Sequence, residues 1–181
     1  MTDGTHYLFE SANLGFRNWT TADLDPMSEI NADPEVMRFF PDIQDKSHTA
    51  AFIERMKAHF QLHGFNYFAV ETKHDAEFIG FIGMAHQTYD SPFTPAVDIG
   101  WRLERAAWGK GLATEGAKAC LAFAKNECKL NRIIAVCPKV NLASERVMQK
   151  IGMHKAGGFL HPLLKDHKHL HECLCYHIEL N

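Results

Sequence analysis

The stretch Ala96-Val97-Asp98-Ile99-Gly100-Trp101-Arg102-Leu103, followed after residues 104–107 by Trp108-Gly109-Lys110-Gly111-Leu112-Ala113-Thr114, sets the architecture of this 181-residue chain. Residues 96–103 are typical of a β-strand, and residues 111–126 are typical of a helix with an apolar inward stripe. A strand rich in β-branched residues follows at 132–137. A strand–helix–strand unit of this kind is expected to be a right-handed crossover that joins two parallel strands.

The segments around this unit predict a mixed α/β (α+β) pattern whose sheet begins antiparallel. Residues 74–77 form a hairpin turn between two strands, and Gly64 ends the long helix that precedes them. The length favours a single domain over residues 1–181. The expected strands are residues 14–19, 67–72, 78–86, 96–103, 132–137, 154–159 and 173–180, and the expected helices begin near Thr20, Asp33, Ser47, Gly111 and Asn141.

The composition is that of a soluble globular protein with a substantial core, because 46% of residues are apolar and 23% are charged. The net charge of −3 offers no basic field for phosphate backbones, which argues against nucleic-acid binding as the main function. We expect no membrane span and no signal peptide. The five cysteines are odd in number and lack paired spacing, so we expect reduced thiols in a cytoplasmic protein.

The loop at residues 108–115 has the features of an anion-binding site. Gly109 and Gly111 let the backbone approach a ligand closely, and the helix that follows presents its N–H groups and its positive dipole end. Lys110 adds one cation. The glycine spacing also echoes a dinucleotide-binding fingerprint, but Thr114 replaces the third glycine. A plain strand–helix turn is the alternative for this segment taken alone.

Several motifs along nearly the whole chain occur in an order typical of one family. They are Leu14-Gly15-Phe16-Arg17-Asn18-Trp19-Thr20, Ile99-Gly100-Trp101-Arg102-Leu103, the segment Gly109 to Gly116, Asn141-Leu142-Ala143-Ser144 and Ile151-Gly152-Met153. The chain resembles the GCN5-related N-acetyltransferase (GNAT) superfamily, and more narrowly its RimJ/RimL-like branch of ribosomal-protein N-terminal acetyltransferases. The resemblance implies a single GNAT-type domain, in which helices flank a mixed, mostly antiparallel sheet with splayed central parallel strands. It also implies an acyltransferase that moves an acetyl group from acetyl-CoA to a primary amine by direct attack.

The resemblance implies that acetyl-CoA (coenzyme A) lies along the strand 99–103 and over the glycine loop. The thioester and pantetheine would pair with that strand, and the pyrophosphate would bind backbone N–H groups from about Gly109 to Thr114. Trp108 stands where the family usually has Arg or Gln. No metal is expected. The predicted coenzyme-binding residues are Ile99, Gly100, Trp101, Arg102, Leu103, Trp108, Gly109, Lys110, Gly111, Leu112, Ala113, Thr114, Asn141 and Ser144.

Ser144 and Asp98 are the predicted catalytic residues. By resemblance, Ser144 is the candidate acid for the leaving thiolate, although a place in the first helical turn after the capping Asn141 would also explain it. Asp98 is the candidate base for the amine proton, directly or through water, with an acceptor-orienting or merely polar strand residue as the alternative. His86, at the end of the neighbouring strand, is a weaker base candidate. An α-amine titrates near 8 and lysine near 10.4, so an α-amine needs less help.

The acceptor and two rival functions stay open. A ribosomal-protein or other peptide N-terminus and a small-molecule amine both fit, and Phe39-Phe40-Pro41 is the predicted acceptor-side lid. The sequence does not define the oligomeric state, although edge strands near the tail could pair between the subunits of a homodimer. A non-catalytic coenzyme A sensor of the same fold is the first rival, and a dinucleotide-binding oxidoreductase is a weaker one. The tail is rich in histidine and cysteine, which are zinc ligands, but their spacing does not support a zinc site. These residues are His154, His161, His167, His169, His171, His177, Cys173 and Cys175.

Overall fold

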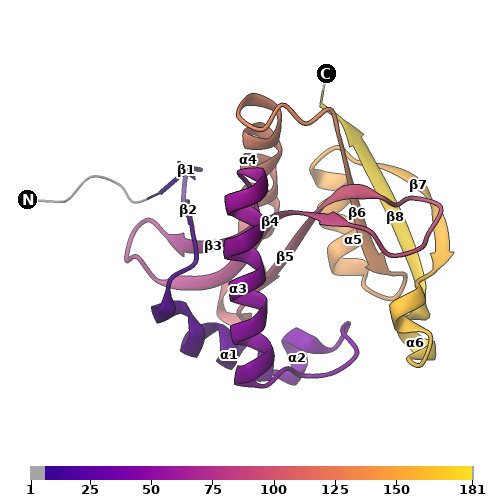
Figure 1. The fold of residues 1–181 in the computed structure, drawn as a ribbon, viewed down its shortest axis with the longest axis horizontal. Coiled ribbons are helices and arrows are strands. Elements are labelled where there is room, and N and C mark those ends of the chain that lie inside the picture. The colour runs from indigo at the N-terminus through magenta and orange to yellow at the C-terminus, as the bar shows by residue number, and fades with distance from the viewer. Residues whose placement is uncertain (1–6, 181) are drawn as a thin grey trace, which may run out of the picture.

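A computed structural model describes residues 7–180 of the chain. Over that range one eight-stranded sheet runs in the order β1-β2-β3-β4-β5-β6-β8-β7 (Figure 1). Neighbouring strands are antiparallel except for β5 and β6, which are parallel. The strands are β1 (Phe9–Glu10), β2 (Leu14–Arg17), β3 (Tyr67–Thr72), β4 (Phe78–Gln87), β5 (Ala96–Leu103), β6 (Arg132–Pro138), β7 (His154–Leu160) and β8 (Glu172–Glu179).

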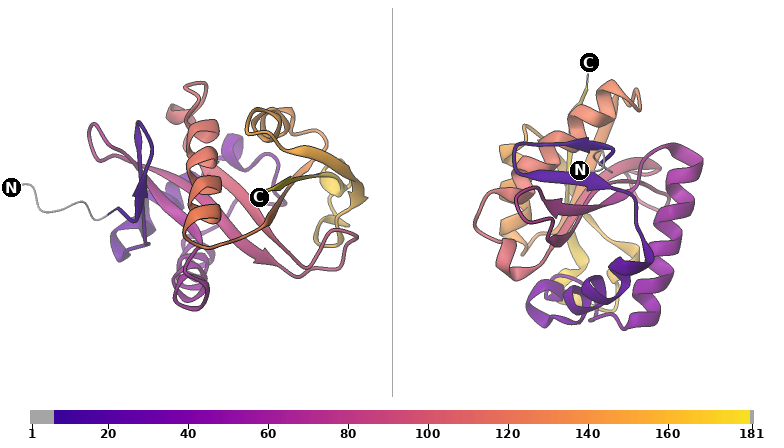
Figure 2. Two further views of the ribbon diagram at one scale, coloured as in Figure 1. Left: turned by 90° about the horizontal axis from the view of Figure 1, so that it is seen from above. Right: turned by 90° about the vertical axis from the view of Figure 1, so that its left-hand side faces the viewer.

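Helices cover both faces of the sheet, with α4 and α5 on one side and α3 on the other (Figure 2). The helices are α1 (Leu24–Ala32), α2 (Pro34–Met37), α3 (Lys46–His63), α4 (Leu112–Asn126), α5 (Leu142–Lys150) and α6 (Lys168–His171), and short 3-10 turns occur at Thr21–Asp23, Arg105–Ala107 and Pro162–Leu164. No helix between residues 7 and 180 is long and apolar enough to cross a membrane.

The two sheet faces carry two separate apolar clusters. Along β4, the adjacent residues Phe81 and Ile82 belong to different clusters, because successive strand residues point to opposite faces. The cluster that contains α4 residues includes Phe16, Phe68, Ile82, Met84 and Cys120. The cluster that contains α1, α2 and α3 residues includes Trp19, Met27, Met37, Ile53, Met56 and Phe81. The sheet is thus held on both sides, and its centre lies at the β4–β5–β6 strands.

The mixed, mostly antiparallel sheet with flanking helices is confirmed, and so is the parallel pairing across the predicted crossover. Some boundaries were wrong. The helix α3 begins at Lys46 and is capped by Asp45, whose carboxylate accepts the His48 N–H over 2.8 Å. The strand β2 ends at Arg17, because the indole of Trp19 turns to donate to the Tyr67 carbonyl over 2.6 Å. The strand β1 and the helix α6 were not anticipated.

Candidate active site

The central strands β5 and β6 part immediately after one paired position. Among the described residues, Asp98 and Ile134 are the only pair in register between these two strands. On its other side, β5 pairs with β4 over residues 96–103. The backbone of residues 99–103 therefore lacks a ladder partner toward β6. This is the expected splay, and unpaired backbone groups at such an edge are available to hydrogen-bond a ligand.

A cleft of about 430 Å³ lies beside this splay. Its walls come from α2 and the loop after it, the second half of β5, the loop before α4, and the start of α5. The volume is within the usual range of roughly 300–1,000 Å³ for small-molecule sites. The predicted coenzyme-binding residues that line it are Trp101, Arg102, Leu103, Trp108, Gly109, Gly111, Leu112, Ala113, Thr114, Asn141 and Ser144.

Three predicted coenzyme-binding residues do not line the cleft. Ile99 is 2% exposed and packs into the core on the α4 side of the sheet. Gly100, on β5, lies against the ring of Tyr67. Lys110 is exposed and does not form part of the cleft wall. For Ile99 and Gly100 only the strand backbone is positioned to meet a ligand in the splay.

The loop before α4 presents a helix terminus with free donors. Gly109 and Gly111 adopt φ of 72° and 79°, the left-handed region that suits glycine. Gly111 is the N-cap of α4 and supplies no side-chain cap. The first N–H groups of a helix have no partner within the helix, so those of α4 are left for solvent or a ligand. A Cβ built on either glycine meets no protein atom within 4 Å, which leaves the space above this terminus open.

Asn141 and Ser144 meet at the start of α5. The side chain of Asn141 caps the helix by accepting the Ser144 N–H over 3.1 Å. The Ser144 hydroxyl in turn accepts from the indole N–H of Trp101 on β5, over 3.3 Å. The capping interpretation of Asn141 is therefore confirmed, and Ser144 is held on the cleft wall opposite β5, where no residue between 7 and 180 accepts its hydroxyl proton.

Asp98 lies at the point where the strands part and is the centre of a hydrogen-bond cluster. The phenol of Tyr67 donates to Asp98 Oδ1 over 2.5 Å, and the Gln87 amide donates to the same oxygen over 3.2 Å. Burial raises the pKa of Asp98 to about 6, and the hydrogen bonds from Tyr67 and Gln87 oppose a larger rise. Burial also raises the pKa of Tyr67 well above its ordinary value, so this phenol stays protonated as a donor.

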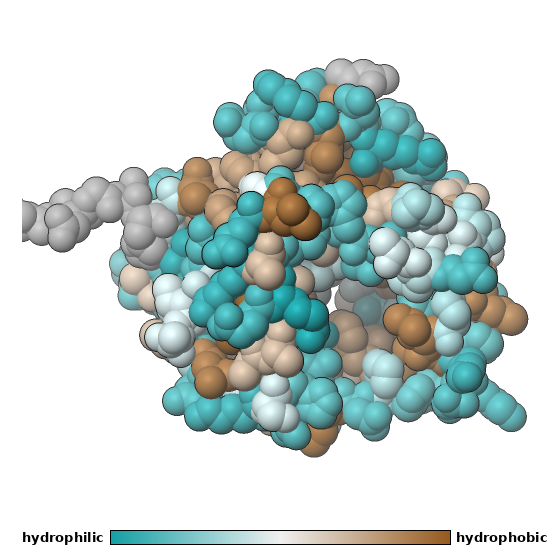
Figure 3. Space-filling model, viewed as in Figure 1, coloured by the Kyte–Doolittle hydropathy of each residue, from teal (hydrophilic) through white to brown (hydrophobic). Residues whose placement is uncertain are grey.

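The side chains of Asp98 and Tyr67 point to the same face of the sheet, the one that α3 covers. Asp98 pairs with Ala85 of β4 and Tyr67 pairs with Gly83, and residues two apart on a strand point to the same side. The α3 face of the molecule is hollowed between α3 and the β7–β8 side (Figure 3). From this register, Asp98 and Tyr67 lie on the face of the sheet opposite the helix α4. His86, the weaker base candidate, lies outside this cluster, and its ring lies beside those of His59 and His63 at the end of α3.

Arg102 lies four residues beyond Asp98 on β5, on the same face of the sheet, and it lines the cleft. Its guanidinium lies 4.0 Å from the ring centre of Phe40 and donates to Asn31 Oδ1 over 2.6 Å. Burial lowers its pKa to about 10, so it remains a cation at neutral pH. Its Nε has no hydrogen-bond partner among the described residues. Phe39 and Phe40 both line the cleft, and their role as an acceptor-side lid stays a prediction.

Sequence reasoning missed Tyr67 and Gln87. Tyr67 begins the predicted strand 67–72 and Gln87 directly follows the predicted strand 78–86, and nothing else in the sequence marks them. The strand register that brings both side chains to Asp98 could not be derived from the sequence. The tail histidines do not join into a metal-binding group within residues 7–180. His169 and His171 lie in α6, which rules out the alternating strand that a ligand set there would need.

Comparison with known proteins gives consistent matches. The family model described as Acetyltransferase (GNAT) domain matches residues 13–154. An uncharacterized N-acetyltransferase of Bacillus subtilis, YnaD, is 31% identical over 147 residues, covering 81% of this chain and 82% of that protein. The solved structure of a GNAT-family acetyltransferase from Bacillus anthracis is 28% identical, with a TM-score of 0.77 over 94% of this chain and 97% of that one. The ribosomal L7/L12 α-N-protein acetyltransferase RimL, solved with coenzyme A, has the same fold at 15% identity, with a TM-score of 0.74 over 93% of this chain and 95% of that one.

Proposed function

Because this chain belongs to the GNAT family of acetyltransferases, we propose that it transfers the acetyl group of acetyl-CoA to a primary amine, and that residues 1–181 act as one catalytic domain. One observation carries the proposal: residues 101–103 of β5, beyond the point where this strand leaves β6, and the uncapped N-terminus of α4 line a single cleft. The helix terminus suits a pyrophosphate, and the unpaired edge of β5 suits the amides of pantetheine.

In this arrangement the thioester lies where β5 leaves β6, between Asp98 and Ser144. The amine nitrogen attacks the thioester carbon, and backbone N–H groups of β5 stabilise the oxyanion. Asp98 takes the proton that the amine releases, directly or through one water. The C–S bond then breaks, Ser144 gives its proton to the departing thiolate, and the proton taken by Asp98 returns to the Ser144 oxygen through water, which restores both groups. Since the pKa of Asp98 is about 6, this carboxyl is ionised and able to accept a proton at neutral pH.

Direct attack is supported by the state of the cysteines. Burial raises the pKa of Cys137 and Cys173 to about 12 and that of Cys175 to about 11. Burial raises the pKa of Cys120 and Cys128 as well. Because the thiolate is the nucleophilic form, none of the five thiols is suited to form an acetyl-enzyme near neutral pH.

An α-amine is the acceptor that this base suits best. An α-amino group titrates near 8 and a lysine near 10.4, so a base of pKa about 6 faces a smaller proton-transfer penalty with an α-amine. The RimJ/RimL-like motifs favour the N-terminus of a ribosomal protein or another peptide, and a small molecule bearing an α-amine is the alternative. The structural likeness to RimL, at 15% identity, supports the fold alone.

Ligand-induced thermal stabilisation tests the coenzyme assignment. Acetyl-CoA and coenzyme A are expected to raise the melting temperature, since a ligand of the native state stabilises it. NADH is expected to leave it unchanged. A shift with NADH and none with acetyl-CoA at millimolar concentration would replace this proposal with the oxidoreductase alternative.

A further inference from the structure

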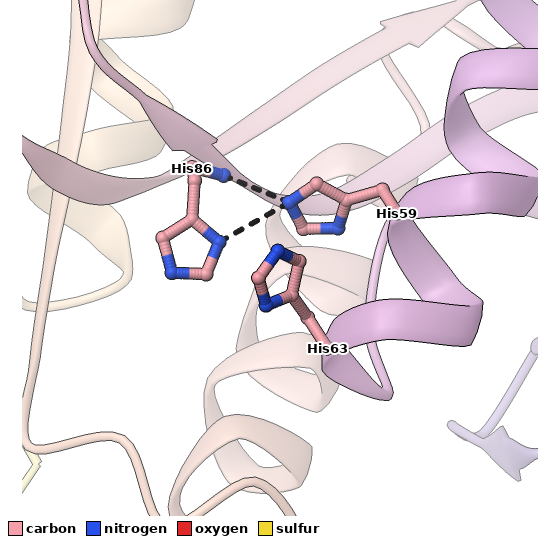
Figure 4. Close-up of side chains that lie close together, drawn as sticks. All are labelled: His59, His63 and His86. Carbon is pink, nitrogen blue, oxygen red and sulfur yellow. Dashed lines mark hydrogen bonds between the residues drawn. The ribbon is translucent and has the colours of Figure 1, made fainter.

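Three histidines gather at the C-terminal end of α3, away from the predicted catalytic cluster. His59 and His63 are one helical turn apart on α3, and His86 is the penultimate residue of β4 (Figure 4). Residues four apart lie on the same side of a helix, so both α3 rings reach β4 together. One ring nitrogen from each of the three residues lies within 4.8 Å of the others.

The orientation of His59 is fixed by the backbone. Its Nδ1 lies 2.7 Å from the carbonyl oxygen of Phe65. A carbonyl only accepts, so Nδ1 carries the proton and Nε2 keeps its lone pair. A hydrogen bond from the second ring nitrogen to a backbone carbonyl is the usual way in which proteins orient a metal-binding imidazole.

The unprotonated nitrogen of His59, Nε2, is approached by two nitrogen atoms of His86. The His86 backbone N–H lies 3.1 Å from His59 Nε2, and His86 Nδ1 lies 3.2 Å from the same atom. An sp² nitrogen has one lone pair, which cannot serve two donors well. Two nitrogens bound to one tetrahedral Zn²⁺ at about 2.0–2.1 Å are about 3.3–3.4 Å apart, close to the spacing of this pair.

The chemistry of the site selects a class of ion. The group identified among residues 7–180 consists of imidazoles alone, without a carboxylate. Imidazole nitrogen suits zinc, cobalt, nickel and copper, whereas Ca²⁺ and Mg²⁺ need oxygen ligands.

We propose that His59, His63 and His86 bind a divalent transition-metal ion of the Zn²⁺ class, with water in the fourth position. The β3–β4 pairing ends at Tyr67 and Gly83, and one further hydrogen bond joins the Met84 N–H to the Asn66 carbonyl, so no strand covers this edge of β4 from Ala85 to Gln87. An ion held here would tie the end of α3 to that edge. It would also anchor the short connection from Gly64 to Tyr67, the residue that hydrogen-bonds Asp98.

The site is tested by metal titration of the metal-free full-length protein. Zn²⁺ binding is measured by calorimetry, and Co²⁺ binding is measured by the visible absorption that a tetrahedral nitrogen site gives. The variants are His63→Ala and His86→Ala, which change exposed side chains and preserve the core. His74→Ala, in the exposed β3–β4 turn, and His169→Ala, in the tail, are the matched controls.

The wild type is expected to bind one equivalent of Zn²⁺ and to show Co²⁺ bands together with a raised melting temperature. Each site variant is expected to lose at least about tenfold in affinity, since even a hydrogen-bond partner of a metal ligand is worth about 10- to 100-fold. The controls are expected to bind as the wild type does. Absence of stoichiometric Zn²⁺ uptake by the folded wild type would overturn the proposal. Binding that survives both site variants and is lost in His169→Ala would also overturn it, because it would place the ion in the tail.

Discussion

The phenol of Tyr67 donates a hydrogen bond to Asp98 Oδ1 over 2.5 Å, joining the start of β3 to the point where β5 and β6 part. Burial raises the pKa of Asp98 to about 6, and this hydrogen bond opposes the rise because it stabilises the carboxylate. The pair thus connects the geometry of the splay with the protonation state of the proposed base.

Replacing Tyr67 by Phe is expected to shift the acid limb of kcat/KM to higher pH. In the wild type, activity should fall as pH drops through about 6, where Asp98 becomes protonated and can no longer accept a proton. Loss of the Tyr67 hydrogen bond raises the pKa of Asp98 further, so the fall should begin earlier. The pH profile of the initial rate measures this, with Tyr7→Phe at the far edge of the sheet as the control. An unshifted acid limb in Tyr67→Phe would separate Asp98 from the rate.

Replacing Ser144 by Ala is expected to lower kcat by about 10²- to 10⁴-fold, the usual contribution of a positioned acid or base. Coenzyme affinity should change little, because the cap of α5 is the Asn141 side chain and the backbone N–H of residue 144, which alanine retains. Steady-state kinetics and coenzyme A titration measure the two effects separately. Ser28→Ala, which removes a hydroxyl bonded within α1, is the control. A wild-type kcat in Ser144→Ala would leave Ser144 as a helix residue only.

Replacing Gly111 by Val is expected to weaken coenzyme A binding through both the side chain and the distorted turn. Gly64 offers a matched control, because its φ of 77° is close to the 79° of Gly111 and a Cβ at either position meets no protein atom within 4 Å. Both variants carry a similar conformational cost of roughly 1–2 kcal/mol. Calorimetric titration should show lost affinity in Gly111→Val and retained affinity in Gly64→Val. Equal affinities in the two variants would contradict a pyrophosphate site at the start of α4.

Replacing Arg17 by Met is expected to destabilise the protein by about 3–5 kcal/mol, because it leaves two buried carboxylates without their cation. Arg17 contacts Asp23 over 2.7 Å and Glu71 over 2.5 Å, and all three side chains are buried. Arg132→Met, which removes the cation of an exposed pair with Glu179, should cost at most about 1 kcal/mol. Urea unfolding at pH 7 measures both. Similar small losses in the two variants would show that the buried triad adds no more than a surface pair.

The same triad gives a pH dependence of stability. Burial raises the pKa of Asp23, but the hydrogen bonds from Arg17 and Thr20 more than offset it, and the net shift is downward. A lowered native pKa contributes stability that is complete above the unfolded value of about 3.9 and is lost as pH falls through the native value. The difference in unfolding free energy between the wild type and Arg17→Met should therefore shrink below pH 4.

The parts of the fold that depend on local chemistry were predictable. Glycine at a left-handed position ends α3 at Gly64 and begins α4 at Gly111, and Asn141 caps α5 as its side chain suggests. The splay between β5 and β6 came from the family resemblance, because no periodicity marks the position at which two parallel strands separate.

The predictions that failed or were missing depended on tertiary register. Tyr67 and Gln87 reach Asp98 because β3, β4 and β5 pair in one register, which their sequences do not encode individually. His59 and His63 are four residues apart within a predicted helix, whereas their third partner, His86, follows from the packing of α3 beside the open edge of β4. The tail histidines are numerous, but they are divided among the strands β7 and β8, the helix α6 and the segments between them, and within residues 7–180 they form no metal-binding group.

The most direct test of acetyl transfer is release of free thiol from acetyl-CoA by the purified protein with a panel of peptides and small molecules bearing α-amines. We predict amine-dependent release by the wild type. Asp98→Asn should keep the thermal stabilisation by acetyl-CoA and lose about 10²- to 10⁴-fold in turnover. Stabilisation by acetyl-CoA without any amine-dependent thiol release from the wild type would contradict the account and identify the protein as a coenzyme A sensor.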